Sequence, residues 1–199
     1  VVGGDLSVSS VLTIAVTAFG DLEGRAPVLR SGARAGDVVA VSGALGDASL
    51  GLHLLFERAV DALGEPDATA AAQLRAEFPD PIGAQLAPSP PISDGVAAAI
   101  AGATAMLDLS DGLVLDARRL ALASGVAVDF ESAAVGGSEA LEGGESHSLL
   151  ATFSPGTALP GGFRAIGRVV AGEGVLVDGA PYERRGGWDP YEGWDGAVG

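Results

Sequence analysis

The sequence predicts an α+β fold in which helices pack on a mixed β-sheet. Short apolar stretches typical of strands alternate along the chain with segments whose apolar residues recur at helical spacing. The many glycines, 31 in all, mark turns between these segments. With 199 residues, 48% of them hydrophobic and 19% charged, the chain can bury a core and is not of the disordered class.

The first elements follow from alternation, glycine positions and helical spacing. Residues 12–20 alternate in polarity and predict a strand that ends at a glycine. Residues 37–42 predict a short strand, and residues 43–47 a glycine-rich turn. A helix is expected from Ala48 to near Gly64. Its apolar positions are Leu52, Leu55, Phe56 and Ala59.

Prolines decide the expectation for the middle of the chain. Residues 79–91 contain five prolines, so we expect no regular structure there. A short helix at 70–78 precedes this stretch, and a helix at 93–101 follows it. An apolar strand at 104–107 comes next.

The second half of the chain supplies most of the predicted sheet. A helix begins at Leu113 and stops at Gly125. Residues 132–145 are expected to form a loop and a short helix. The remaining strands are expected at 126–130, 149–154 and 163–170, with a hairpin arm at 175–179. We expect the helices to cover one face of this sheet.

Charge and composition exclude several classes of function. The net charge is −15, and the only paired basic residues are at 118–119 and 184–185, so a nucleic-acid binder is not expected. The absence of cysteine excludes disulfides, thiolate catalysis and cysteine-based zinc sites. His53 and His147 do not suggest a histidine-rich metal site. No membrane span or secretory signal is evident, and we expect a cytoplasmic location.

The most informative motif is Asp-Leu-Ser-Asp-Gly-Leu at residues 108–113. It places two carboxylates and a hydroxyl where a strand runs into a helix, next to free backbone N–H groups and the positive end of the helix dipole. Asp108 and Asp111 could hold a divalent cation whose other ligands are phosphate oxygens and water. The motif therefore suggests metal-bridged phosphate chemistry. In the alternative interpretation, Ser110 or Asp111 is an ordinary helix N-cap.

Weaker motifs precede this one. Gly4 and Asp5 belong to a Gly-Gly-Asp sequence that lets backbone approach a bound group, or that forms a plain turn. Arg30 begins a loop of small residues and could clamp a phosphate, or could be a solvated loop arginine. The glycine-rich turn at 42–47 could cradle a phosphate, or could be a tight turn whose helix is capped by a polar side chain.

Two further motifs follow residues 108–113 in the sequence. Residues 143–145 are a flexible glycine pair that leads to the carboxylate of Glu145. Trp188 and Trp194 each occur in Gly-Trp-Asp. A tryptophan at such a place can stack on a flat heteroaromatic ring, or can pack down as an anchor.

Taken in order, these motifs resemble the thiamine-monophosphate kinases, which are part of the PurM-like superfamily with aminoimidazole-ribonucleotide synthetase. The similarity extends from Val1 to about Asp195. Its most specific parts are residues 30–37, 43–52 and 108–113. The resemblance implies ATP-dependent phosphorylation of thiamine phosphate to thiamine diphosphate by direct transfer, assisted by several Mg²⁺ ions. No side chain is assigned as a catalytic acid, base or nucleophile.

The resemblance also implies roles for particular residues. Asp5, Asp108 and Asp111 are expected to bind Mg²⁺. Gly4, Arg30 and Ser110 are expected to bind ATP. Glu145 and Trp188 are expected to contact thiamine phosphate, with Trp194 as the alternative to Trp188. A homodimer is expected for the full-length family.

The sequence departs from the family pattern in ways that affect these expectations. Similar kinases begin with a separate ATP-binding domain, and we expect residues 1–32 to be its last piece, including one strand. Residues 33–199 are expected to be the PurM-like C-terminal domain. The family sequence Gly-Gly-Glu-Asp-Tyr-Glu-Leu is here Gly-Gly-Glu-Ser-His-Ser-Leu at residues 143–149, without two acids and one aromatic. Leu6 replaces the threonine of Gly-Gly-Asp-Thr.

Two alternatives remain open. The chain could derive from another ATP-using member of the superfamily that acts on a different phosphate or on a carboxylate. It could instead be a substrate-binding fragment that folds without turning over, and we expect the isolated chain to be an incomplete kinase.

Overall fold

The computed structural model describes residues 3–4, 8 and 10–189. Its strands are β1 (Val38–Ser42), β2 (Ala105–Leu109), β3 (Ala127–Phe130), β4 (Ser148–Phe153), β5 (Arg164–Val170), β6 (Gly174–Val177) and β7 (Ala180–Pro181). Within the described ranges these strands form one sheet in the order β2-β4-β1-β5-β3-β6-β7. The β3–β6 pair is parallel and the other pairs are antiparallel, so the sheet is mixed as predicted.

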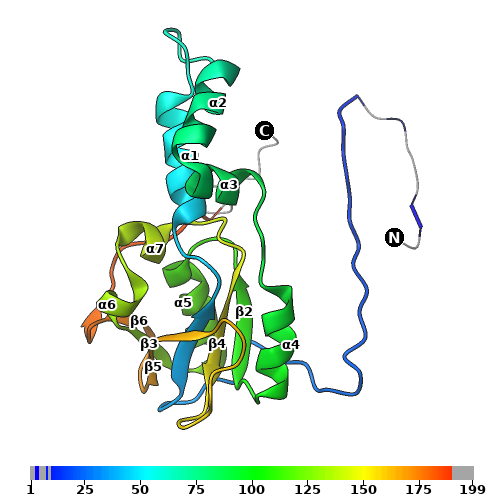
Figure 1. Ribbon diagram of the computed structural model, residues 1–199. Coiled ribbons are helices and arrows are strands. Elements are labelled where there is room, and N and C mark those ends of the chain that lie inside the picture. Colours follow the sequence, from blue (N-terminus) through cyan, green and yellow to red (C-terminus); the bar gives the residue numbers. More distant parts are fainter. Residues whose placement is uncertain (1–2, 5–7, 9, 190–199) are drawn as a thin grey trace.

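Some helices pack against the sheet, whereas α1 to α3, within residues 47–86, form a separate helical projection that is called the excursion below (Figure 1). They are α1 (Asp47–Arg58), α2 (Ala68–Glu77), α3 (Pro79–Leu86), α4 (Ile92–Ile100), α5 (Leu113–Ser124), α6 (Ser132–Val135) and α7 (Ser138–Glu142). Helices α5, α6 and α7 contribute to the main hydrophobic cluster on one face of the sheet. Helices α1, α2 and α3 project beyond the end of the sheet (Figure 1).

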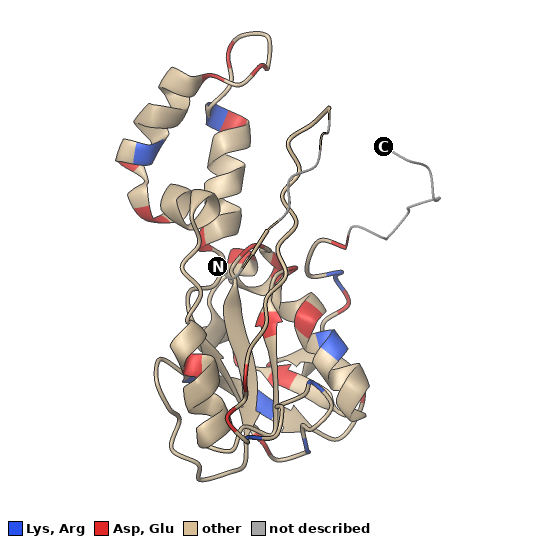
Figure 2. Cartoon of the chain, turned by 90° about the vertical axis from the view of Figure 1, so that its right-hand side faces the viewer, with Lys and Arg blue, Asp and Glu red and all other residues tan. Residues whose placement is uncertain are grey.

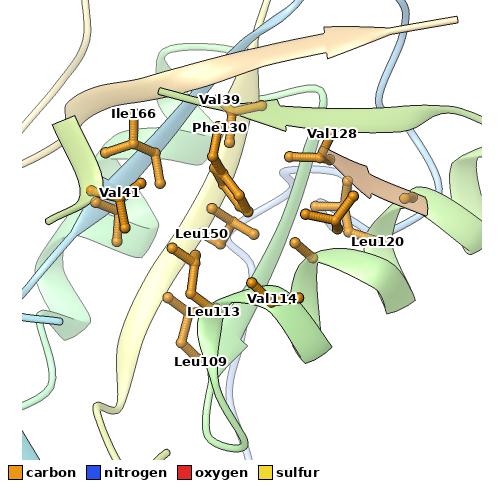
Figure 3. Packing of buried hydrophobic residues seen from close by; sticks show 14 of the residues in the cluster. Val39, Val41, Leu109, Leu113, Val114, Leu120, Val128, Phe130, Leu150 and Ile166 are labelled. Carbon is orange, nitrogen blue, oxygen red and sulfur yellow. The ribbon is translucent and has the colours of Figure 1, made fainter. Parts of the chain in front are cut away.

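The main core lies between α5 and the sheet (Figure 3). Alternate residues of the strands point to this face, as the pleat requires. Val41 of β1 and Leu150 of β4 are register partners and belong to the same cluster. Leu113 and Leu120 of α5 are buried against them, and the helix predicted to begin at Leu113 and stop at Gly125 is confirmed.

The prediction that helices cover one face of the sheet is wrong, because α4 covers the other face. Ala98 of α4 packs with Ala40 of β1 and with Ala151 and Phe153 of β4 in a second cluster. Apolar residues on both sides of β1 and β4 need cover on both sides. The rings of Phe163 and Phe153 pack edge to face in this cluster, with their centroids 5.5 Å apart.

The expectation of irregular structure at 79–91 is also wrong for its first half, which forms α3. Pro79 is the first residue of α3, where a missing N–H costs nothing and the fixed φ suits a helix. Ile82 then packs with Leu74 and Ala59 in a small cluster that holds α1, α2 and α3 together. The excursion thus has its own core.

Residues 12–20 do not form the predicted strand. They carry no strand assignment, and every one of them is exposed. Leu12 and Val16, for example, are 92% and 84% exposed. A strand needs a partner for its backbone hydrogen bonds, and within the part of the chain described here none pairs with this segment. The alternating pattern alone could not show this.

The helix predicted to end near Gly64 ends earlier, at Arg58, because Val60 pairs with Pro66 in an isolated bridge. The remaining predicted elements are confirmed with small shifts of their ends. The predicted hairpin arm at 175–179 is β6 with its turn to β7. Asp178 and Gly179 have φ values of 52° and 79°, the left-handed backbone that a two-residue hairpin turn requires. The Asp178 carboxylate accepts hydrogen bonds from the backbone N–H and hydroxyl of Ser132, which lowers its pKa below the ordinary 3.8.

Acidic residues outnumber basic ones both on the part built around the sheet and on the excursion (Figure 2). Among the described residues, no helix is both long enough and apolar enough to cross a membrane. The buried core begins at Ala33, while the division of the chain at residue 32 into two domains stays a prediction.

Two glycines of the excursion are expected to respond oppositely to replacement by alanine. A Cβ at Gly51 of α1 would lie 2.1 Å from the Pro81 carbonyl oxygen, so Gly51→Ala must displace α3 and should cost about 1–3 kcal/mol of the free energy of unfolding. A Cβ at Gly83 of α3 meets nothing within 4 Å. Gly83→Ala should therefore stabilise by about 0.5–1 kcal/mol through helix propensity.

Urea unfolding of the two variants beside the unmodified chain measures both effects. A Gly51→Ala variant as stable as Gly83→Ala would contradict the close contact between α1 and α3.

Candidate functional site

The turn from β2 to α5, residues 110–112, is the centre of the candidate site. Leu109 before it and Leu113 after it are each 1% exposed, so both ends of the turn are fixed in the main core. Asp108, one residue further back, points to the opposite side of β2 and is exposed. The alternation of the strand therefore separates Asp108 from Ser110 and Asp111 more than their spacing in sequence suggests.

Two glycine segments lie directly against this turn. A Cβ at Gly112 would be 2.9 Å from the carbonyl oxygens of both Glu142 and Gly186. A Cβ at Gly187 would be 2.4 Å from the carbonyl oxygen of Asp111. Gly112 also has a φ of 131°, which side-chain-bearing residues rarely adopt. Glycine is thus required where the three stretches of backbone meet.

Backbone hydrogen bonds tie the same stretches together. The N–H of Glu145 donates to the carbonyl oxygen of Ser110 at 2.7 Å, and the N–H of Trp188 donates to that of Asp111 at 3.0 Å. The N–H of Leu115 donates to the carbonyl oxygen of Gly186 at 3.2 Å. The positions of Glu145 and Trp188 are therefore fixed relative to the turn through main-chain atoms.

Asp116 supports the turn from inside the first turn of α5. Its side chain is 2% exposed, and its Oδ2 accepts the backbone N–H groups of Ser110 and Asp111, both at 3.1 Å. Burial raises the pKa of Asp116 above the ordinary 3.8, against the lowering effects of the Asp111 N–H and of Arg119. Gly112 occupies the N-cap position of α5, and no side chain caps this helix end. The alternative in which the Ser110 or Asp111 side chain caps α5 is therefore wrong.

Arg119 joins Asp116 to Asp111. Its Nη1 lies 2.6 Å from Oδ1 of Asp116 and 2.5 Å from Oδ2 of Asp111. The pKa of Arg119 is raised, mainly by its hydrogen bond to Asp111. The carboxylate of Asp111 thus has a cationic partner within the chain.

A cavity of about 900 Å³ opens beside the turn. This volume suits a small organic ligand. Four separate parts of the chain line it: α1, the turn, the α7 region and the 184–188 segment. The lining residues that carry the chemistry are Ser49, Leu52, His53, Phe56, Ser110, Asp111, Glu139, Glu142, Glu145, Arg184, Arg185 and Trp188.

Most of the charged groups around this cavity are paired. Glu142 accepts hydrogen bonds from the Tyr182 hydroxyl and, at 2.8 Å, from Arg184. The Tyr182 pKa is raised, first by burial and then by Glu142. Glu145 lies 3.2 Å from Nε2 of His147. Both Glu145 and His147 have positive φ values, 62° and 48°, in the segment where the sequence departs from the family pattern.

The structure brings together four of the predicted site residues. Ser110, Asp111, Glu145 and Trp188 all line the large cavity, and Trp188 is 66% exposed. Asp108 lines a separate cavity of about 180 Å³. That cavity also contacts Pro90, Pro91, Ile92, His147 and Leu149.

Arg30 and Gly4 are not brought to the cavity. The backbone of Arg30 lies at the far end of α5, where its carbonyl oxygen accepts the Ser124 hydroxyl, roughly 18 Å of helix from the turn. Gly4 is exposed, and a Cβ there would meet nothing within 4 Å. Asp5 and Trp194 lie outside the described residues.

The donor types present suit a hard divalent cation, although the described residues hold no group of three metal-ligating side chains. Asp108 and Asp111 offer carboxylate oxygens, the ligands that Mg²⁺ prefers. Asp108 is exposed, while Asp111 would have to exchange its contact with Arg119 for a metal. The third predicted ligand, Asp5, is not among the described residues.

Sequence reasoning missed the contribution of α1 to the site. It gave Leu52, Leu55, Phe56 and Ala59 together as the apolar positions of this helix, but the structure separates them into two pairs. Leu55 and Ala59 pack in the core of the excursion, whereas Leu52 and Phe56 line the cavity. It also missed Asp116 and Arg119, which the helical spacing of three residues could have shown as a pair beside Asp111.

Comparison with known proteins adds to this geometry. No protein-family model matches the chain. The chain is similar to the thiamine-monophosphate kinase of Mycobacterium tuberculosis (strain CDC 1551), with 41% identity over 212 residues that cover 98% of this chain and 56% of the relative. It thus spans about half the length of the curated relatives it matches.

Solved structures show the same similarity. AaThiL complexed with AMPPCP and TMP is 35% identical, with a TM-score of 0.63 over 80% of this chain and 53% of that one. Thiamine-monophosphate kinase from Stenotrophomonas maltophilia K279a is 29% identical, with a TM-score of 0.67 over 80% of this chain and 55% of that one. The mixed α/β fold described above is shared with these proteins.

Removal of the Asp116 carboxylate is expected to loosen the turn. Asp116→Ala leaves two backbone N–H groups without their acceptor and removes one of the two carboxylates that Arg119 contacts, so it should cost about 2 kcal/mol or more of the free energy of unfolding at neutral pH. Arg118→Ala is the matched control on the same helix, because its guanidinium contacts the carbonyl oxygens of the 182–185 segment and not the turn. Chemical unfolding measures the free energy of unfolding of both variants beside that of the unmodified chain.

The pH dependence gives a second measurement. Because burial raises the pKa of Asp116, the folded protein binds this proton at a higher pH than the unfolded chain does. The group thus contributes most to stability below pH 3.8, and this contribution is lost as the pH rises through the folded-state pKa. The cost of Asp116→Asn should therefore be smaller at pH 7 than at pH 4, and the reverse order would contradict the raised pKa.

Proposed function

The chain is a homologue of the thiamine-monophosphate kinases, and from this premise we propose that it provides the substrate-binding side of an enzyme that phosphorylates thiamine phosphate. ATP is the proposed phosphoryl donor, and thiamine diphosphate the product. The observation that carries the proposal is that Ser110, Asp111, Glu145 and Trp188 line the same cavity. These residues come from three distant segments of the sequence, and each belongs to a motif that the family resemblance singled out.

The cavity has the chemistry that thiamine phosphate needs. Its aromatic and aliphatic residues offer an apolar wall for the two rings, and its carboxylates suit the positive charge of the thiazolium. Arg184 and Arg185 on the same cavity offer positive charge for a phosphate. We assign Glu145 and Trp188 to thiamine phosphate and Ser110 to ATP.

The acceptor explains why no catalytic base is required. Thiamine phosphate is a phosphate monoester, so its attacking oxygen is ionised near neutral pH. Phosphoryl transfer then depends on alignment of the two phosphates and on neutralisation of their charge. We assign Asp108, Asp111 and Asp5 as the residues that would hold Mg²⁺, which when bound neutralises phosphate charge. The protein groups fix the positions of the two phosphates.

Several expectations remain predictions within this proposal. They are the contacts of Gly4 and Arg30 with ATP, the homodimer, the cytoplasmic location, and the division of the chain into residues 1–32 and 33–199. The proposal also expects the isolated chain to be incomplete as a kinase. A substrate-binding role without turnover is the second candidate, because the chain spans about half the length of its relatives.

A coupled ADP-release assay with ATP, Mg²⁺ and thiamine phosphate tests the proposal. The chain is assayed alone and joined to the part of the Mycobacterium tuberculosis relative that it does not match. The joined protein should turn over, and Asp108→Ala should lower its rate by about a hundredfold or more. Asp80→Ala, an exposed carboxylate in the first turn of α3, is the matched control and should leave the rate unchanged.

Chromatography of the products gives the deciding readout. Thiamine diphosphate formed in step with ADP supports the proposal. Equal ADP release without thiamine phosphate, or full activity of the Asp108→Ala variant, would contradict it.

A further inference from the structure

Helix α1 presents a stripe of four side chains to the large cavity. Ser49, Leu52, His53 and Phe56 all line it, and their spacing of three, four and seven residues places them on one face of a helix. Leu54 and Leu55 lie on the other side, where they pack in the core of the excursion. Helix α1 thus has two apolar faces, and only one of them serves the core.

Phe56 is the unusual member of this stripe. It is 72% exposed and belongs to none of the three hydrophobic clusters of buried residues. Trp188, on the 184–188 segment, is 66% exposed and borders the same cavity. Two large aromatic side chains therefore leave much of their area uncovered at one concave site, which is typical of a surface that a ligand covers.

The position of α1 is fixed close to the rest of the site. Gly46, directly before α1, has a φ of 83°, and a Cβ there would lie 2.8 Å from backbone atoms of residues 139 and 140. Ser49 donates a hydrogen bond to Glu139 at 2.9 Å, and His53 lies 3.6 Å from the same carboxylate. These contacts anchor the stripe to α7, so Phe56 is carried on a rigid support.

The charges around the stripe indicate what kind of ring it suits. The cavity is lined by four carboxylates, Asp111, Glu139, Glu142 and Glu145, and by two guanidinium groups, Arg184 and Arg185. Asp111 and Glu142 have guanidinium partners. Glu139 and Glu145 contact histidines instead, and acidic charge of this kind beside two aromatic side chains favours a ring that carries positive charge. The thiazolium of thiamine phosphate is such a ring.

We propose that Phe56 and Leu52 of α1 form, with Trp188, the apolar wall that binds the rings of thiamine phosphate. This inference rests on the proposed function and adds a contact from α1 to it. Phe56 acts on binding of the rings and not on transfer of the phosphoryl group. Its loss should therefore weaken thiamine and thiamine phosphate by the same factor.

Calorimetric titration of the 199-residue chain with thiamine phosphate, thiamine and inorganic phosphate tests this wall. Phe56→Ala should weaken both thiamine compounds by about tenfold or more, while Phe56→Tyr keeps an aromatic ring and should stay within about threefold. Leu63→Ala is the matched control, because Leu63 is 86% exposed on the same excursion and lines none of the described cavities. Fluorescence of Trp188, isolated by Trp194→Phe, reports whether the ring reaches it.

The outcomes separate this inference from the proposed function. Equal affinity of Phe56→Ala and the unmodified chain for thiamine phosphate would overturn the role of Phe56 and leave the proposed kinase intact. A chain that binds neither thiamine compound would also overturn the wall, while the ADP-release assay of the joined protein decides the kinase independently. Binding that Phe56→Ala weakens and Phe56→Tyr preserves supports the inference.

Discussion

The meeting of three backbone segments at residues 110–112 is the constraint on which the rest of the site depends. The segments at 142–145 and 186–188 approach this turn so closely that a Cβ at Gly112 or Gly187 would overlap neighbouring carbonyl oxygens. Hydrogen bonds from the N–H groups of Glu145 and Trp188 close the contact. The two side chains proposed to bind substrate therefore take their positions from main-chain geometry, which tolerates little adjustment.

The same contact connects the sheet to the helical excursion. Gly143 follows α7, and a Cβ on it would lie 2.6 Å from the Cβ of Ser49 in α1. The start of α1 is thus held against the loop that also carries Glu145. A buried carboxylate, Asp116, supports the turn from below, and Arg119 supplies its counter-charge. Burial of an acid in a chain of net charge −15 is tolerated here because two N–H groups and a guanidinium share its oxygens.

Much of the fold could be predicted from the sequence, because hydrophobic spacing, proline and glycine act locally. The strand at β1, the helix from Leu113 to Gly125 and the hairpin at Asp178 were all evident in this way. What failed depended on distant partners: the strand at 12–20 has none in the described structure, and α4 covers the second face of the sheet. At the site, motifs indicated Ser110, Asp111, Glu145 and Trp188, but only tertiary packing shows which face of α1 joins them.

Native-state hydrogen exchange of single amides, followed by NMR, tests the central claim most directly. If the three segments form one unit, the N–H groups of Glu145 and Trp188, which donate to the turn, should open with the same free energy as those of Ser110 and Asp111, which donate to Asp116. Exchange of Glu145 or Trp188 near the rate of an unprotected amide, while Ser110 and Asp111 stay protected, would contradict the claim.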